Sequence, residues 1–126
     1  MKLRIKGDSI RLRLTRSEVA ALADGGRISD QTRFPAGAAL GYCVVAEAAV
    51  PFVAAGFDGG VVTIRIPLES ARAWAGSEEV TIRAELPVDG GTLVLLVEKD
   101  FPCTTPRAGV DDRDELFDQR RSVDVL

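Results

Sequence analysis

Histidine is absent from this chain of 126 residues, and its absence removes several kinds of site. Ser-His-Asp and Cys-His nucleophile pairs, imidazole ligands for zinc, and the commonest general base near neutral pH all require histidine. Cysteine is scarce as well: Cys43 and Cys103 are the only two, and they form no CxxC motif. Two thiols without histidine do not complete a tetrahedral zinc site within one chain. A cytoplasmic protein with reduced thiols is therefore expected.

Three further shortages narrow the range of partners. One tryptophan, one tyrosine and five phenylalanines are too few for a base-stacking surface. A net charge of −3 with a pI near 5.0 is unlike the basic domains that bind nucleic acid. No apolar run approaches the roughly 18 to 20 residues that span a bilayer, and residues 1–14 lack the apolar core of a secretory signal. The sequence predicts that neither nucleic acid nor a membrane is the partner.

The composition is that of one ordinary domain. Hydrophobic residues make up 46% of the chain and charged residues 28%, close to the average of globular proteins. Charge is distributed unevenly: residues 1–35 hold eight lysines and arginines against four acids, and residues 36–126 hold eight against fifteen. Such a separation favours docking between oppositely charged surfaces, within one molecule or between two.

Two regions of different character are predicted. Residues 1–103 are expected to form a single β-rich domain, and residues 104–126 an acidic tail that is poor in apolar side chains. A tail of this composition is expected to be flexible, although Leu116 and Phe117 in it can anchor it to a groove. Its acidic residues are Asp111, Asp112, Asp114, Glu115, Asp118 and Asp124.

The clearest local pattern lies at the amino end. Charged and apolar residues alternate over residues 2–6 and again over residues 10–14, with Gly7-Asp8-Ser9 between them. Alternation with a period of two is typical of a half-buried strand, and the intervening residues suit a turn. The sequence predicts a β-hairpin with an apolar inner face and a basic outer face.

Two short helices are also expected. Thr15 and Glu18 have the spacing of a capping box, in which two side chains bind backbone N–H groups at the start of a helix. A second helix is predicted over residues 67–75, with Pro67 in its first turn. Trp74 is expected to anchor this second helix in the core.

The remaining segments decide the fold class. Further strands are predicted over residues 27–34, 38–47, 52–57, 61–66, 80–86 and 92–99. Together with the hairpin they predict a mainly β domain of about eight strands, an antiparallel barrel or sandwich with two short helices. The alternative is an α+β fold in which a helix packs on one open sheet. Residues 93–97 are apolar throughout, a pattern typical of a central strand covered on both faces.

Both ends of the chain carry recognisable motifs. The amino end has Lys2-Leu3-Arg4-Ile5-Lys6-Gly7, then Ser9-Ile10-Arg11-Leu12-Arg13-Leu14-Thr15, and the carboxyl end has Val97-Glu98-Lys99-Asp100-Phe101 followed by Cys103. In these motifs the chain resembles a family of small bacterial proteins that form a domain of unknown function. The resemblance implies a single bacterial domain over nearly the whole chain and carries no activity with it.

The basic outer face of the predicted hairpin is the first candidate site. Several guanidinium groups on one sheet can hold a carboxylate or a phosphate through paired hydrogen bonds. Two arginines in later strands occupy similar positions. The candidate anion- or partner-binding residues are Lys2, Arg4, Lys6, Arg11, Arg13, Arg65 and Arg83. The alternative is a solvated face whose charges pair across strands.

Glu98 and Asp100 form a second candidate, a polar cluster at the end of the last predicted strand. Two carboxylates on one strand face can hold a divalent metal or divide the roles of acid and base, but charges also mark the exit of a strand into water. Cys103 has no histidine to activate it as a nucleophile, and Cys43 is expected in the core. No catalytic residue and no cofactor are predicted.

These observations favour a small cytoplasmic binding or assembly module without catalysis, which forms a homo-oligomer or binds a protein partner through its basic face. The second hypothesis is a receptor for an anionic, phosphorylated small molecule held by Arg4, Arg11, Arg13, Arg65 and Arg83. The third is a metal-dependent enzyme that uses Glu98 and Asp100.

Overall fold

The alternating residues at the amino end form the predicted hairpin. In the computed structural model, which describes residues 1–100, β1 (Lys2–Ile5) pairs antiparallel with β2 (Ser9–Leu14). Gly7 in the turn has a φ of 54°, a left-handed conformation that glycine adopts at little cost. Leu12 and Leu14 are each 1% exposed, so the apolar face of the hairpin points into the core.

The capping box is present at the start of α1 (Arg16–Ala23). The Thr15 hydroxyl accepts a hydrogen bond from the Glu18 N–H at 3.3 Å, and the Thr15 N–H donates to the Glu18 carboxylate at 2.9 Å. These bonds occupy N–H groups that the first turn of a helix leaves without partners.

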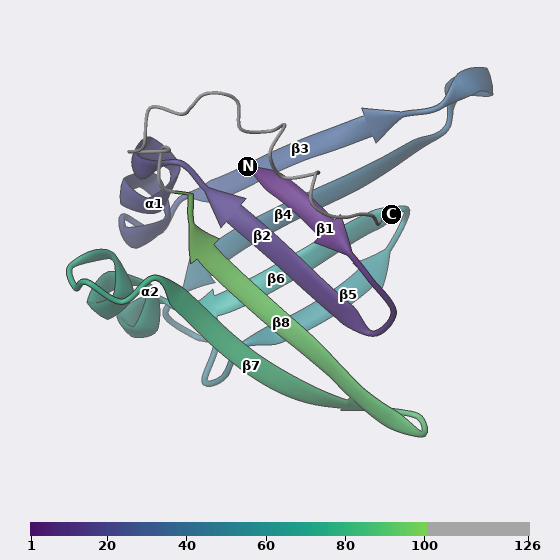
Figure 1. Cartoon of the computed structure of the whole chain (residues 1–126). Coiled ribbons are helices and arrows are strands. Elements are labelled where there is room, and N and C mark those ends of the chain that lie inside the picture. The colour runs from purple at the N-terminus through teal and green to yellow at the C-terminus, as the bar shows by residue number, and fades with distance from the viewer. Residues whose placement is uncertain (101–126) are drawn as a thin grey trace, which may run out of the picture.

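The second helix, α2 (Leu68–Ala75), begins after Pro67 and ends at Gly76. Trp74 is 2% exposed, and its indole N–H donates a hydrogen bond to the Val80 carbonyl at 3.0 Å. The prediction that Trp74 anchors this helix in the core is confirmed. The two helices pack against each other at one end of the molecule (Figure 1).

Among residues 1–100, eight strands form two four-stranded sheets. Sheet A has the order β1-β2-β8-β7 and sheet B the order β3-β4-β6-β5. Figure 1 shows the two sheets stacked, with the strands of one running across those of the other. The remaining strands are β3 (Arg27–Arg33), β4 (Ala39–Glu47), β5 (Ala54–Asp58), β6 (Val61–Pro67), β7 (Thr81–Val88) and β8 (Gly91–Lys99). A short 3₁₀ turn, Pro35–Gly37, joins β3 to β4. The mainly β, sandwich-like class is confirmed, and neither sheet of the described part of the chain closes into a barrel.

The predicted antiparallel arrangement needs one correction: both sheets are mixed. β2 lies parallel to β8, and β4 lies parallel to β6, whereas the other neighbours are antiparallel. Alternation in a sequence indicates which face of a strand is buried, but it carries no signal for the direction of the neighbouring strand. The two parallel pairs join hairpins that are far apart in the chain.

The chain is built from two halves with the same order of elements. Strand, strand, helix, strand, strand describes β1 to β4 and again β5 to β8. Each sheet takes one hairpin from each half: β1-β2 joins β7-β8, and β3-β4 joins β5-β6. Leu3 pairs with Leu12 in β1 and β2, and Ala55 pairs with Ile64 in β5 and β6. Ala55 follows Leu3 in the sequence by the same number of residues as Ile64 follows Leu12. The described fold is therefore an interlocked structural repeat with a pseudo-twofold relation between its halves.

Backbone contacts repeat in the two halves as well. The Val94 N–H donates to the Asp8 carbonyl at 2.9 Å, and the Gly41 N–H donates to the Gly60 carbonyl at 2.8 Å. Both bonds join the start of a parallel pair to the turn of the neighbouring hairpin. The buried side chains between the sheets come from both halves and form one core. They include Leu12, Leu14, Val44, Ile64, Ile66, Leu95 and Val97.

Two sequence predictions fall on the carboxyl end. The domain boundary at residue 103 and the acidic tail, residues 104–126, lie outside the described residues. Within residues 1–100, no helix combines the length and the apolar character needed to cross a membrane.

Candidate functional site

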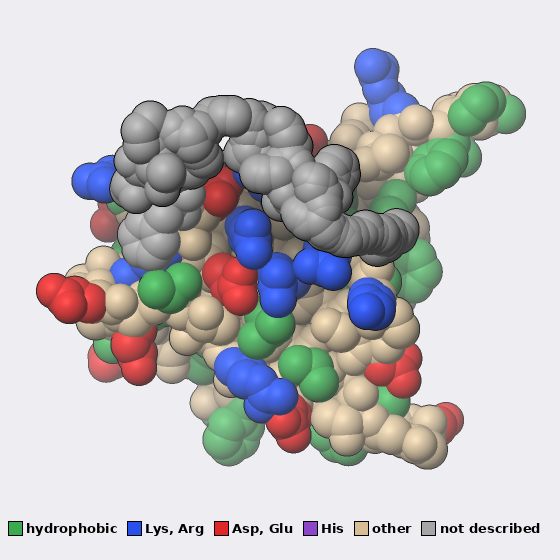
Figure 2. All heavy atoms as spheres, viewed as in Figure 1, with side chains coloured by type: hydrophobic (Ala, Val, Ile, Leu, Met, Phe, Trp, Pro, Cys, Tyr) green, Lys and Arg blue, Asp and Glu red, His purple; other side chains and the backbone are tan. Residues whose placement is uncertain are grey.

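Five of the predicted basic residues lie on the outer face of sheet A. The strand registers align Arg4, Arg11, Leu96 and Arg83 in one row across the four strands, with Arg13 beside Glu98 in the next row. Figure 2 shows Lys and Arg side chains gathered on this face. We call this surface the cationic face and define it by Lys2, Arg4, Arg11, Arg13 and Arg83.

Carboxylates neutralise part of the cationic face. Glu98 contacts two arginines, at 3.6 Å from Arg11 Nε and 3.2 Å from Arg13 Nε. Lys2 pairs with Asp100 at 3.1 Å, and Arg83 pairs with Glu85 on its own strand. These contacts agree with the alternative interpretation from the sequence, in which charges on a sheet pair with their neighbours.

Arg4 and Arg11 are not fully compensated. They are direct partners across β1 and β2, a position in which like charges repel. Arg11 shares Glu98 with Arg13, and Arg4 forms no ion pair within residues 1–100. Two guanidinium groups therefore share one carboxylate and the third, that of Arg4, has none among residues 1–100, which leaves a net positive charge at the centre of the face.

Two of the predicted basic residues are placed elsewhere. Arg65 lies on β6 in sheet B, where its Nε is 3.6 Å from a Glu47 oxygen, so the structure does not bring it to the cationic face. Lys6 follows β1 in the turn of the hairpin and is exposed. Arg65 and Arg83 were predicted to be equivalent because both follow a Val-Thr-Ile segment, but these segments belong to different sheets.

The predicted polar cluster, Glu98 and Asp100, consists of two carboxylates with separate cationic partners. No three Cys, Asp or Glu side chains gather into a possible metal group in the part of the chain that the structure describes. The arrangement fits charge pairing at the edge of the cationic face.

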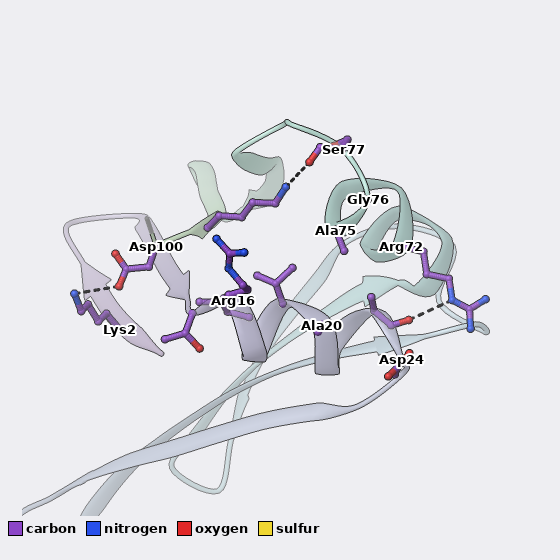
Figure 3. A pocket seen from close by; sticks show the side chains of 14 residues that line it. Lys2, Arg16, Ala20, Asp24, Arg72, Ala75, Gly76, Ser77 and Asp100 are labelled. Atoms are coloured by element: carbon purple, nitrogen blue, oxygen red, sulfur yellow. Dashed lines mark hydrogen bonds and ion pairs between the residues drawn. The ribbon is translucent and has the colours of Figure 1, made fainter. Parts of the chain in front are cut away.

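A second feature, a groove between α1 and α2, was not predicted from the sequence. It has a volume of about 1210 Å³, and we call it the interhelical groove. Its apolar lining includes Leu14, Val19, Ala20, Ala23 and Ala75, and the cations that line it are Lys2, Arg16, Arg72 and Lys99. Figure 3 shows the side chain of Arg16 between Asp100 on one side and Ala75 on the other.

Hydrogen bonds hold two of these cations in place. The Arg72 Nε donates to the Ala23 carbonyl at 3.2 Å, which ties α2 to the end of α1. The Lys99 ammonium donates to the Ser77 carbonyl at 2.8 Å and lies 5.5 Å from the centre of the Trp74 ring. The groove is thus bordered by cations that the fold positions.

The start of α1 also binds the amino terminus. The Met1 ammonium donates to a Glu18 carboxylate oxygen at 2.8 Å. Burial by itself raises the pKa of Glu18, but hydrogen bonds from Met1 and Thr15, together with the positive charge of the Met1 ammonium, outweigh it and lower this pKa below 4.5. Glu18 therefore remains ionised while it holds β1 to α1.

Comparison with known protein families covers both of the surfaces described above. A family model described as "Family of unknown function (DUF7009)" matches residues 1–121. The chain belongs to this family. The match confirms the resemblance found in the end motifs and covers both the cationic face and the interhelical groove. Neither the comparison with curated proteins nor that with solved structures found a match.

The cysteine predictions have separate outcomes. Cys43 is buried, as predicted, but it lies on the outer side of sheet B, where Arg27 Nη2 is 3.2 Å from its sulfur. Cys103 lies outside the described residues.

No sequence pattern predicts the interhelical groove, because its cations come from four separate elements or their ends. Arg16 and Arg72 each stand alone on a helix of eight residues. The motif Glu98-Lys99-Asp100 drew attention only to its carboxylates, whereas Lys99 is the residue of the three that contacts Trp74.

Proposed function

We propose that this protein is a binding module whose cationic face holds an acidic protein partner. The observation that carries the proposal is the opposition of Arg4 and Arg11 across β1 and β2. Glu98 is shared by Arg11 and Arg13, and Arg4 has no ion pair among residues 1–100. Like charges placed directly opposite each other destabilise a sheet. An incoming carboxylate relieves this repulsion through charge-assisted hydrogen bonds to the guanidinium groups.

The second half of the chain supplies an internal control for this argument. The register that pairs Arg4 with Arg11 in β1 and β2 pairs Gly56 with Thr63 in β5 and β6. The same strand geometry therefore forms with neutral residues at both positions. The two arginines are not a requirement of the architecture, which supports a role in binding.

The shape of the face favours a protein over a small molecule. Two hollows of the described surface lie between the helices and beside Phe52, and neither is lined by Arg4, Arg11 or Arg83. Leu96 stands in the same row as these arginines and is partly exposed. An acidic segment with apolar side chains can use both kinds of contact, as flat protein interfaces do.

The test is binding of a defined acidic peptide. A fluorescein-labelled 12-residue peptide of alternating Glu and Leu serves as the probe, with a Lys-Leu peptide of the same length as its counterpart, and fluorescence anisotropy reports binding. The double variant Arg4→Glu/Arg11→Glu should weaken binding of the Glu-Leu peptide at least tenfold. Arg65→Glu, a charge reversal on the other sheet, is the matched control and should change the affinity less than twofold.

Salt and light scattering complete the test. Affinity for the Glu-Leu peptide should fall as salt rises, because the pairs are solvent-accessible. Equal binding of both peptides, or equal loss in the Arg65→Glu control, would refute the proposal. A salt-dependent dimer in light scattering that Arg4→Glu/Arg11→Glu abolishes would identify a second copy of this chain as the acidic partner.

The other candidate function is a receptor for a phosphorylated small molecule, and the same arginines support it because guanidinium groups bind phosphate in a bidentate manner. Inorganic triphosphate is the probe. A rise in melting temperature with triphosphate, lost in Arg4→Glu/Arg11→Glu, together with no binding of the Glu-Leu peptide, would favour this function over the first.

A further inference from the structure

The interhelical groove carries charge that the described chain does not neutralise. Lys2 pairs with Asp100, but Arg16, Arg72 and Lys99 form no ion pair with any carboxylate among residues 1–100. The hydrogen bonds of Arg72 and Lys99 go to backbone carbonyls. Among residues 1–100, the acids that line the groove are Asp24 and Asp100. The groove therefore offers a cationic border to an anionic occupant.

Its floor is apolar. Val19, Ala20, Ala23 and Ala75 present small side chains on the facing sides of the two helices, and Ala20 is exposed. An apolar floor between cations fits an occupant that combines apolar side chains with carboxylates, because each part then finds a matching surface.

Residues 110–118 of this chain have that composition. The segment Val110-Asp111-Asp112-Arg113-Asp114-Glu115-Leu116-Phe117-Asp118 contains five carboxylates, one arginine and three apolar residues. The described chain ends at Asp100, which itself lines the groove. The tail therefore begins where the groove lies.

We propose that residues 110–118 dock in the interhelical groove of the same molecule, with Leu116 and Phe117 on the apolar floor and the flanking carboxylates against Arg16, Arg72 and Lys99. This inference is independent of the function proposed for the cationic face. It replaces the expectation that the whole of residues 104–126 is flexible with a docked segment.

Reach and local concentration support an occupant from the same chain. Fifteen residues separate Asp100 from Leu116, and an extended chain of that length spans about 50 Å, more than enough to cross a groove between two helices of eight residues. A short linker holds a segment at a millimolar effective concentration, on the order of 1 mM. The family match also runs through this segment, to residue 121.

The experiment is nuclear magnetic resonance of the full ¹⁵N-labelled chain. Leu116→Asp/Phe117→Asp should shift the amide signals of Ala20, Ala23 and Ala75. Order parameters of residues 110–118 should fall from about 0.85 to below about 0.6 in this variant, the values of rigid and flexible backbone. Val123→Asp/Val125→Asp makes the same number of apolar-to-acid changes elsewhere in the tail and should leave both readouts at their wild-type values.

The groove side is tested independently with Ala20→Trp, which fills the groove at an exposed position. It should release residues 110–118 as the tail variant does, and the triple variant with Leu116→Asp/Phe117→Asp should add nothing further. Ala21→Trp, one residue along α1 and outside the groove lining, is the control and should keep the segment rigid.

Four results would overturn the proposal. The first is low order parameters for residues 110–118 in the wild type, and the second is amide shifts in the tail variant that are confined to Arg11, Leu96 and their neighbours on the cationic face. The third is equal release of the segment by Ala21→Trp, and the fourth is docking that disappears on dilution. The last result would assign the groove to the tail of a second copy.

Discussion

The β1-β2-α1 unit and the β5-β6-α2 unit bury the same positions and expose different residues. Leu12 and Leu14 in the first correspond to Ile64 and Ile66 in the second, and all four are at most 1% exposed. On the opposite face of the same strands, the opposed pair Arg4 and Arg11 corresponds to Gly56 and Thr63.

The comparison separates what the fold needs from what it permits. Both units keep apolar residues toward the core, because burial of apolar surface stabilises the packing of the two sheets. The exposed face carries no such requirement, so this opposed pair is cationic in one unit and neutral in the other. The charges on the outer face of sheet A can therefore serve binding, because the fold does not depend on them.

The two helices also bury side chains toward the core but differ in how they begin. Val19 and Leu22 in α1 and Ala71 and Trp74 in α2 are the buried residues of their helices. α1 begins with a capping box, whereas α2 begins after Pro67 with no side-chain cap. The larger anchor, Trp74, belongs to the helix without a cap.

The largest effect is expected from the core anchors. Trp74→Ala should lower the free energy of unfolding by about 3–5 kcal/mol, and Leu22→Ala by about 2–5 kcal/mol. Trp74→Ala should cost more, since it also removes the hydrogen bond to the Val80 carbonyl. Urea denaturation followed by far-ultraviolet circular dichroism measures both. A greater loss in Leu22→Ala would reverse this ranking of the two units.

A smaller effect, dependent on pH, is expected from Glu18. Its pKa is lowered in the folded protein from 4.5, so the stability that it contributes is complete above 4.5 and declines as the pH falls through the lowered value. Glu18→Gln should therefore cost about 1 kcal/mol at pH 7 and become similar in stability to the wild type in acid. Urea denaturation over a pH series measures the difference.

Glu69, the acid in the first turn of α2, supplies the control for that series. It forms no ion pair among residues 1–100, so Glu69→Gln should lower the free energy of unfolding at pH 7 by less than Glu18→Gln does. An equal loss in the two variants at pH 7, or a loss for Glu18→Gln that does not change with pH, would contradict the role assigned to the charge of Glu18.

The smallest effect is expected on the cationic face. Arg11→Thr installs the residue type found at the corresponding position, Thr63, and should change the free energy of unfolding by no more than about 0.5 kcal/mol. Relief of the repulsion from Arg4 offsets the loss of the contact with Glu98. A loss above about 1.5 kcal/mol in urea denaturation would show that Arg11 supports the fold, and would remove the internal control on which the proposed function depends.

Local features of the fold were predictable because their signals are local. Thr15 and Glu18 lie three residues apart and act within one helical turn, and alternation in β2 put Leu12 and Leu14 on the core side. Residues 93–97 were predicted to be covered on both faces. β8 is indeed internal in sheet A, but Val94 and Leu96 remain partly exposed on its outer face.

The candidate sites were predictable only in part. Lys2, Arg4, Arg11 and Arg13 share a face because they belong to one hairpin. Arg83 joins them and Arg65 does not, since membership of a sheet depends on which hairpins pair. The interhelical groove depends on the packing of α1 against α2, for which two helices of eight residues carry no sequence signal.

The amino-acid sequence alone determined the strands, the helix boundaries, the inward side chains and the basic face of the first hairpin, because each follows from spacing over a few residues. Tertiary structure decided which hairpins share a sheet, which neighbouring strands run parallel, and where the interhelical groove lies. These depend on contacts between residues far apart in the chain, such as Leu12 and Val97, whose free energy is gained only when both sheets close over one core.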